Sequence, residues 1–349
     1  MRQSNFELLR IICMFGVLTS HSLMSIYDLH TNHFSVTNEL LVFVMNASCL
    51  AVNCFVLISG WFQIKQSPKS FYGLWSPCIF WATISCGLAF AFGERSLIEF
   101  ASMVFFPLTE TGCWFLTTYF ALFLISPLLN NGINYMDDES IVKVSIFLLL
   151  VDVYIGYLHQ SKYITIDGYH LVHFVTLYVL GSALRRVRIT KLNTRKLALI
   201  VIFLIAMMTG LHMCKILFPP TAILYSMRYN SPILLLTSVL AFLMFSTLKF
   251  QSKVINWVAG SVLAVYIIST LPFFGPRYYN VLKLIVNNYS GFMAFILVLS
   301  SMVAFYFACI IVDKLRVMLC KPLDRYLIDK FVKLNSAFRK MLTQSLNSN

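Results

Sequence analysis

Long apolar stretches dominate the chain, and their lengths predict its fold. Ten of them approach the roughly 20 apolar residues that a helix needs to cross the hydrocarbon core of a bilayer. No internal repeat, Gly/Ser-rich linker or low-complexity segment separates them. The pattern predicts an all-α fold, a polytopic membrane helical bundle of about ten transmembrane helices. The predicted spans are 6–27, 40–63, 71–92, 112–130, 142–158, 168–185, 197–218, 232–248, 256–274 and 291–313.

Composition agrees with a membrane protein. Hydrophobic residues make up 59% of the chain, charged residues 12%, and the mean hydropathy is +0.77. A soluble domain carries about 25% charged residues. No segment outside the spans is long enough for a second folded domain, so we expect a transmembrane domain at 1–313 and a cytoplasmic tail at 314–349. The apolar stretch Phe100–Pro107 is too short to cross and is expected to be re-entrant or interfacial.

Two local features set further expectations. The first apolar stretch contains Arg10 and has no cleavage site of small residues, so it is expected to be a retained span and not a signal peptide. The nine cysteines lie almost all within apolar stretches, without a CxxC pair or a Cys/His group at zinc-ligand spacing. We therefore expect buried, small hydrophobic cysteines and no metal site.

The basic residues indicate the orientation of the chain. Loop 28–39 has no Lys or Arg, whereas basic residues crowd the segment 185–196 and the tail after residue 313. Cytoplasmic loops carry an excess of Lys and Arg, so both termini are predicted to be cytoplasmic. The formal net charge of +13 is then a topology signal. Membrane lipid is the expected partner, and nucleic acid is not.

The basic tail has an apolar stripe of its own. Its apolar residues recur at helical spacing between the Lys and Arg residues. This pattern predicts an amphipathic helix that lies on the inner leaflet. A short coiled or partner-binding helix is the alternative. The stripe consists of Leu323, Leu327, Phe331, Leu334, Phe338 and Met341.

The first span carries three ionisable residues, Glu7, Arg10 and His21. A helix advances about 100° per residue, so Arg10 and His21 share one face, about 16 Å apart along the axis. Glu7 precedes Arg10 at i,i+3 spacing and is expected to pair with it. An ionisable group at mid-membrane costs about 2.5–3.5 kcal/mol. Either these groups face the bundle interior and act there, or Arg10 snorkels to the cytoplasmic surface and His21 sits at the outer interface.

The residue types on this face suit acyl transfer. A neutral His can act as the general base that acylation of a hydroxyl needs. An Arg near the cytoplasm suits a phosphate-bearing donor, because its planar fork of donors matches phosphate oxygens. The predicted orientation places Arg10 towards the cytoplasm and His21 in the outer half of the bilayer. The axis of the first span would then join an inner donor to an outer acceptor.

The chain resembles the membrane-bound acyltransferase 3 family. The pattern Glu7-x-x-Arg10-x10-His21 is similar to the acidic-x-x-Arg-x10-His signature of that family. Three further motifs follow in the family's order, and the resemblance covers roughly residues 5–313. They are "FFxxSGφ" at 55–62, "WFL…Y…P-L" at 112–129 and "FφLG…φ" at 178–185.

The resemblance implies an enzyme, a fold and a location. Its members are multi-pass bacterial inner-membrane enzymes that O-acylate glycans, usually by acetylation. The implied donor substrate is acetyl-CoA, no cofactor is bound, and the acceptor is a glycan or lipid-linked glycan. It also makes His21 and Arg10 the catalytic pair. On this basis we assign His21 as base or transient acyl carrier, Arg10 as binding the CoA phosphates or orienting the thioester, and Glu7 as holding Arg10.

One departure concerns the start of the third span. Many members carry an Arg-x-Arg pair there, whereas this chain has Lys65 and Lys69 and no Arg. If the family's pair grips phosphates, these lysines would substitute as point charges, with less geometric specificity.

Other polar residues within the spans are candidates with a structural alternative. Asp152 is an acid within the fifth span, either functional or a hydrogen-bonded acid at the outer end of its helix. Asn53 and Ser59 in the second span either line a cavity or join helices. The pair Ser59-Gly60 is expected to permit close helix approach.

Two further pairs lie near span ends. His170 and His173 at i,i+3 spacing would contact a sugar or bind a metal, although placement at the outer interface is the preferred interpretation. Trp114 and Tyr119 would stack on a sugar ring or anchor the aromatic belt at the interface.

Two other functions compete with acyl transfer. A secondary transporter would use buried Arg, Asp and His as a proton relay, but such proteins usually show repeats in two halves, and none is visible here. A non-catalytic subunit of a glycan assembly or export system is the second rival. Loss of acylation in a His21 variant would support an enzyme over the transporter and the non-catalytic subunit.

Overall fold

The computed structural model describes residues 2–27, 36–107, 112–160, 167–187, 192–218 and 227–347. These residues form helices and connections, without a strand among them, which confirms the all-α prediction. The helices are α1 (Ser4–Ile26), α2 (Val36–Phe62), α3 (Pro68–Ala91), α4 (Leu97–Phe105), α5 (Trp114–Tyr135), α6 (Asp138–Val151), the π-helix η1 (Asp152–Leu158), α7 (Leu171–Val187), α8 (Thr194–Leu217), α9 (Pro232–Ser246), α10 (Lys253–Ala259), α11 (Val262–Thr270), α12 (Phe274–Asn288) and α13 (Gly291–Asn347).

Every predicted span coincides with one helix or with two consecutive helices. Within the described ranges, eight helical segments are long and apolar enough to cross a membrane, so the protein is a multi-pass membrane protein. The helices α7 and α9, with 17 and 15 residues, are shorter. The count of ten spans and the cytoplasmic position of both termini stay predictions. The short stretch Phe100–Pro107 lies largely in α4, which packs on α3.

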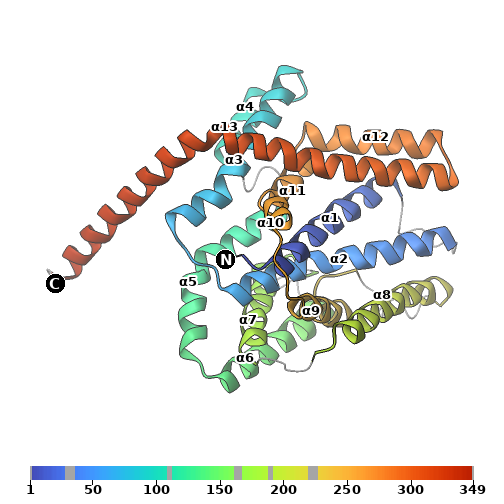
Figure 1. Cartoon of the computed structure of the whole chain (residues 1–349), viewed down its shortest axis with the longest axis horizontal. Helices are drawn as coiled ribbons and strands as arrows, with labels where there is room; N and C mark the ends of the chain where they lie inside the picture. The colour runs from blue at the N-terminus through green and yellow to red at the C-terminus, as the bar shows by residue number, and fades with distance from the viewer. Residues whose placement is uncertain are drawn as a thin grey trace.

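The helix α12 is absent from the predicted elements. It lies against α13 (Figure 1) and buries Gly275, Tyr278 and Leu282 on one face. Its other positions include Arg277, Lys283 and asparagines. A window of hydropathy misses such a helix because the apolar residues occupy only one of its faces.

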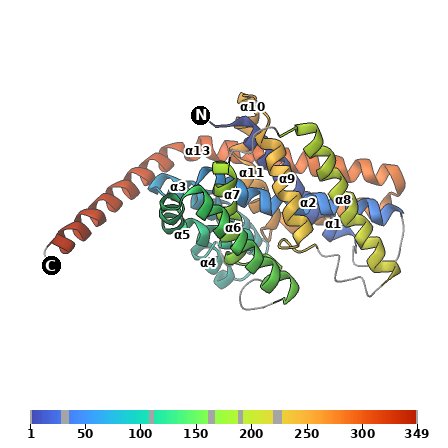
Figure 2. The ribbon, with the colours of Figure 1, turned by 90° about the horizontal axis from the view of Figure 1, so that it is seen from below.

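The two helices α1 and α2 lie side by side at the centre of the bundle (Figures 1 and 2). The helices α7, α8 and α9 pack against α2, whereas α10, α11 and α12 pack against α1. Phe6 and Leu9 belong to the core cluster around α2, and Met14 and Leu18 to a second cluster around α11 and α13. The first span therefore lies between the two halves of the core.

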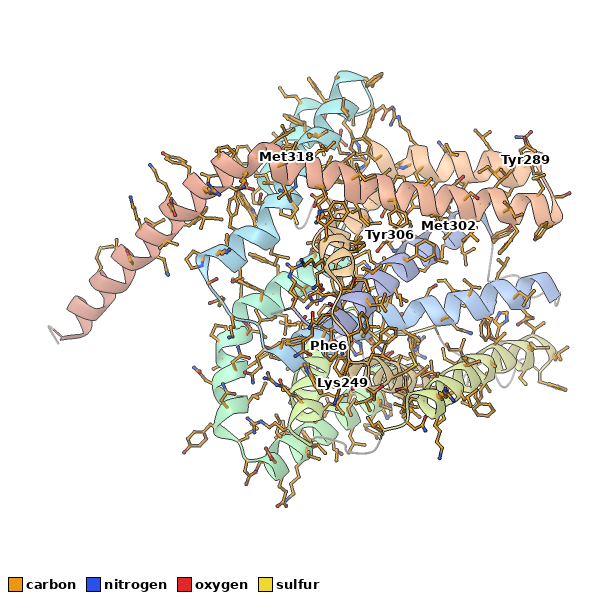
Figure 3. The ribbon with its side chains drawn as sticks, viewed as in Figure 1. Phe6, Lys249, Tyr289, Met302, Tyr306 and Met318 are labelled. Atoms are coloured by element: carbon orange, nitrogen blue, oxygen red, sulfur yellow. The ribbon has the colours of Figure 1, made fainter. Side chains whose placement is uncertain are left out.

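Close packing fixes both sides of this centre. On one side, the ring of Phe6 lies 5.7 Å from that of Trp61 and 5.4 Å from that of Phe242. On the other, the hydroxyl of Tyr306 in α13 donates to the carbonyl of Ile11 at 2.9 Å. Figure 3 labels Phe6 and Tyr306 at these positions. Rotation of α1 about its axis is thereby opposed from both sides.

The helices α2 and α7 approach closely at two glycines, as the pair Ser59-Gly60 predicted. A Cβ added to Gly60 would collide with the carbonyl oxygen of Tyr178, and one added to Gly181 with the carbonyl oxygen of Leu57. Both colliding atoms are backbone, so side-chain movement cannot relieve the clash. Any larger residue must separate the helices.

We expect Gly60→Ala and Gly181→Ala each to destabilise the protein by about 1–3 kcal/mol or more, the usual range for overpacking a filled core. The measurement is the midpoint of thermal denaturation in detergent. Gly210→Ala is the matched control, because a Cβ on this α8 glycine would meet no atom within 4 Å. Equal midpoints for all three variants would contradict the close approach.

The tail is helical, as predicted, but it continues the last span without interruption: α13 runs from Gly291 to Asn347. Beyond residue 313 the helix extends away from the bundle towards the C-terminus (Figure 1). Asp324 accepts a hydrogen bond from Tyr72 of α3 at 2.6 Å, and the ring of Phe331 lies 6.2 Å from that of Phe71. Part of the apolar stripe thus faces the start of α3. Its placement on a leaflet stays a prediction.

Candidate active site

The predicted pair at the start of α1 is present. Arg10 donates to Glu7 at 2.7 Å, and the exposed fractions of the two side chains are 33% and 6%. A buried carboxylate with an ionised donor is a charge-assisted contact. The pair borders a pocket of about 430 Å³ that Arg2, Gln3 and Phe62 complete. Glu7 therefore fixes a guanidinium that still reaches solvent and a pocket.

The other candidate on α1, His21, lines a small, partly enclosed cavity of about 30 Å³. Its ring lies 6.1 Å from that of Tyr266, and no described protein group hydrogen-bonds its nitrogens. A cavity of this size holds about one or two water-sized groups. The cavity is lined by Met14, Val17, Ser20, His21, Ser48, Val52, Phe55, Trp114, Phe115, Tyr229 and Tyr266.

Tyr266 of α11 adds a second polar group to this cavity. The residue is 4% exposed, and its hydroxyl has no hydrogen-bond partner among the described groups. Buried polar groups are nearly always paired, so an unpaired hydroxyl beside an unpaired imidazole marks a place for a polar ligand. Sequence reasoning missed Tyr266, because nothing in its apolar stretch indicates that it faces His21.

The weaker candidates are distributed unevenly. Trp114 lines the His21 cavity, as a ligand-contacting residue would. Ser59 and Tyr119 hydrogen-bond each other at 3.0 Å, joining α2 to α5, and neither lines that cavity. Lys65 and Lys69 are exposed before and at the start of α3, and neither lines the pocket of Arg10. Their predicted roles in binding stay predictions.

Asp152 and Asn53 meet through a histidine. In the fully buried chain of side chains, His173 Nδ1 lies 2.6 Å from Asp152 Oδ2, and His173 Nε2 lies 3.1 Å from Asn53 Oδ1. Asn53 donates its amide to the carbonyl of Tyr229 at 3.0 Å, which assigns Oδ1 as the acceptor facing His173. We call Asp152, His173 and Asn53 the buried polar chain.

This arrangement corrects one interpretation. His173 is 0% exposed and hydrogen-bonded at both ring nitrogens, so its preferred placement at the outer interface is wrong. Both ring nitrogens of His173 contact Asp152 and Asn53, so His173 has no nitrogen left to bind a sugar or a metal together with His170. Asn53 does not line the His21 cavity but holds Tyr229, which does. Asp152 is hydrogen-bonded, and it is the first residue of η1, directly after α6.

Metal ligation finds no support in these groups. Across the described ranges, no cluster of three or more His, Cys, Asp or Glu side chains is arranged to hold a metal ion. The Arg10 and His21 ends of α1 instead offer a cation near a pocket and an imidazole inside a cavity, which suits group transfer more than ligation.

The protein is a multi-pass helical membrane protein whose first helix carries a paired arginine, Arg10, and a cavity-lining histidine, His21. The chain belongs to the acyltransferase 3 family: the family model, described as an acyltransferase domain, matches residues 3–313. It is therefore a membrane acyltransferase. No curated protein and no solved structure shows significant similarity to the chain.

Proposed function

We propose that this acyltransferase moves an acetyl or other short acyl group from cytoplasmic acyl-CoA to a hydroxyl of a cell-surface polysaccharide. It would do so in the inner membrane of a bacterium. The observation that carries the proposal is the arrangement along α1: Arg10 borders an open pocket at one end, and His21 lines a small cavity about 16 Å further along the axis.

The donor end is suited to an anion. Arg10 and Arg2 border the same pocket, and Glu7 holds the guanidinium of Arg10 in place. CoA carries its phosphates at one end and its thioester at the end of an extended pantetheine arm. Phosphates at Arg10 would let that arm run along α1 towards His21. Acyl-CoA serves as a substrate here, and no resident cofactor is assigned.

The acceptor end is suited to proton transfer. In our assignment the neutral ring of His21 takes the proton of the acceptor hydroxyl while its oxygen attacks the thioester carbonyl. The carbon–sulfur bond then breaks, and the CoA thiolate takes up the proton. In the alternative, a ring nitrogen attacks the thioester carbonyl and the carbon–sulfur bond breaks to release the CoA thiolate. The acceptor oxygen then attacks the acyl group on His21, its proton passes to the thiolate, and the acyl–nitrogen bond breaks to restore the neutral ring. Both routes need one unprotonated ring nitrogen that faces the cavity, which His21 lines.

Deletion of the gene, with the wild-type gene returned as the control, tests the function. We expect NMR of the purified surface polysaccharide to lose O-acyl signals on deletion and to regain them on complementation. Unchanged O-acyl signals in the deletion strain would reject a polysaccharide acceptor. Unchanged acylation together with a failure of glycan export would favour the assembly or export role.

Arg10 provides a test of the donor end. We expect Arg10→Ala to raise the half-saturating acetyl-CoA concentration at least about tenfold, since an ionised hydrogen bond contributes about 1.5–3 kcal/mol. Arg10→Lys should recover part of this loss, because lysine keeps the charge without the planar fork. Arg195→Ala is the matched control, as this arginine is exposed at the start of α8. Equal acetyl-CoA dependence in Arg10→Ala and Arg195→Ala would refute donor binding at Arg10.

A further inference from the structure

Three aromatic residues from separate parts of the chain meet at the edge of the His21 cavity. The ring centroid of Trp114 lies 4.3 Å from that of Tyr169 and 5.6 Å from that of Tyr229, and the two tyrosines are 5.2 Å apart. We call these three residues the aromatic cap. Trp114 and Tyr229 line the cavity, whereas Tyr169 is 42% exposed. The cap thus leads from the protein surface to His21.

The two segments that carry the tyrosines are joined to each other. Asp167 pairs with Arg228 at 2.7 Å, and its carbonyl accepts a hydrogen bond from the Tyr229 amide at 2.9 Å. Gly168, the residue between Asp167 and Tyr169, has a φ of +82°. A Cβ added to it would stand 2.6 Å from Cβ of Tyr229. Only glycine combines this backbone conformation with so close an approach.

Hydrogen bonds to two backbone carbonyls also hold the aromatic cap in place. The buried polar chain holds Tyr229 through the bond from Asn53 to its carbonyl. The hydroxyl of Thr118 donates to the carbonyl of Tyr169 at 3.2 Å. Next to Tyr229, the side chain of Asn230 is fully buried, and neither its oxygen nor its nitrogen has a partner among the described groups. A rigid aromatic surface that borders a cavity resembles a binding site more than a lipid-facing belt.

We propose that the aromatic cap is the acceptor subsite, on which a pyranose ring of the glycan stacks while one of its hydroxyls reaches His21. This inference rests on the proposed function. The cavity of about 30 Å³ has room for a hydroxyl and a small reacting group, and a sugar ring does not fit inside it. The ring must therefore remain at the mouth, where the exposed ring of Tyr169, packed on Trp114, offers an apolar face to the C–H face of a pyranose.

The position of the aromatic residues argues against an interfacial anchor. Belt aromatics place their rings at the headgroup level. Here Trp114 and Tyr229 are partly buried and border a cavity that contains the proposed catalytic base. Only Tyr169 faces outwards, which makes it the ring that a bulky acceptor meets first and the side chain that can be changed with least effect on folding.

The test measures acyl transfer by purified protein in nanodiscs. Labelled acetyl-CoA is the donor, and a dilution series of alkali-treated, de-O-acylated surface polysaccharide from the producing cell is the acceptor. We expect Tyr169→Ala to raise the half-saturating acceptor concentration about five- to tenfold, the factor expected for loss of a ring-stacking contact. The half-saturating acetyl-CoA concentration should not change, and Tyr169→Phe should stay within about twofold of wild type, because the ring is kept.

Tyr135→Ala is the matched control, since Tyr135 is 96% exposed at the other end of α5. An acceptor dependence of Tyr169→Ala equal to that of wild type and Tyr135→Ala overturns the subsite and leaves the proposed function intact. An equal loss in Tyr169→Phe and Tyr169→Ala overturns ring stacking as its cause. Absence of transfer by the wild-type protein overturns both the acceptor class and the subsite.

Discussion

Replacement of His21 by alanine is expected to abolish acyl transfer while the protein remains in the membrane. The side chain lines a cavity and makes no hydrogen bond with the described groups, so its removal takes away a reactive imidazole without breaking an internal network. A positioned general base contributes about 10²–10⁴-fold to rate. We expect a loss of that size in transfer of labelled acetyl from acetyl-CoA to the polysaccharide.

His159→Ala is the control for this variant, because His159 is an exposed histidine just after η1. Membrane abundance and the thermal denaturation midpoint of both variants should match the wild type. Full transfer activity in His21→Ala would remove His21 from the reaction. Acylation that persists while glycan export stops would instead support the non-catalytic role.

Much of the fold is encoded locally and was predictable. Each long apolar stretch must become a helix in a bilayer, because no water is present to pair its backbone groups. The helix α12 is not predicted in this way, because its buried residues Gly275, Tyr278 and Leu282 form a single stripe in a segment that is otherwise largely polar. The course of α13 was also hidden, because the charged residues after 313 indicate the end of a span but not the end of a helix.

The candidate site divides in the same way. Glu7 and Arg10 are one turn apart, so helix periodicity alone predicted their contact. The buried polar chain joins residues that are 21 and 120 positions apart in sequence. Such contacts depend on how α2, η1 and α7 pack, which no local spacing encodes. The polar character of Asp152 and Asn53 within apolar spans indicates a special role for each. The sequence pattern favours the interface for His173, the histidine that joins them.

The helix α1 lies where the two halves of the bundle meet. It contributes to both core clusters, and helices from either half fix its rotation. The residues around His21 consequently come from α1, α2, α5, α11 and the segment before α9. A change in any of these elements alters the cavity, whereas the pocket at Arg10 is formed almost entirely by the first residues of the chain and Phe62.

The second large effect is expected at Asp152. The side-chain oxygen of Asn53 lies 3.1 Å from Nε2 of His173, and Nδ1 of the same ring lies 2.6 Å from the carboxyl group of Asp152. Asp152→Ala removes the carboxyl group and leaves Nδ1 of the fully buried His173 ring without a partner. An unpaired buried nitrogen costs about 1–3 kcal/mol, and removal of the carboxyl group also leaves a cavity, so we expect a lower denaturation midpoint in detergent.

A double variant distinguishes the unpaired ring from simple loss of packing. Asp152→Leu with His173→Leu removes both partners, and replacement of a buried pair by apolar residues is often neutral. We therefore expect the double variant to be more stable than Asp152→Ala. Glu139→Ala serves as the control, because this acid of α6 is paired with Lys143 at the surface. If Asp152→Ala denatures like Glu139→Ala, the pair does not stabilise the bundle. If the double variant is stable but transfers poorly, the buried polar chain acts by holding Tyr229 at the cavity, since Asn53 then lacks the ring that orients it.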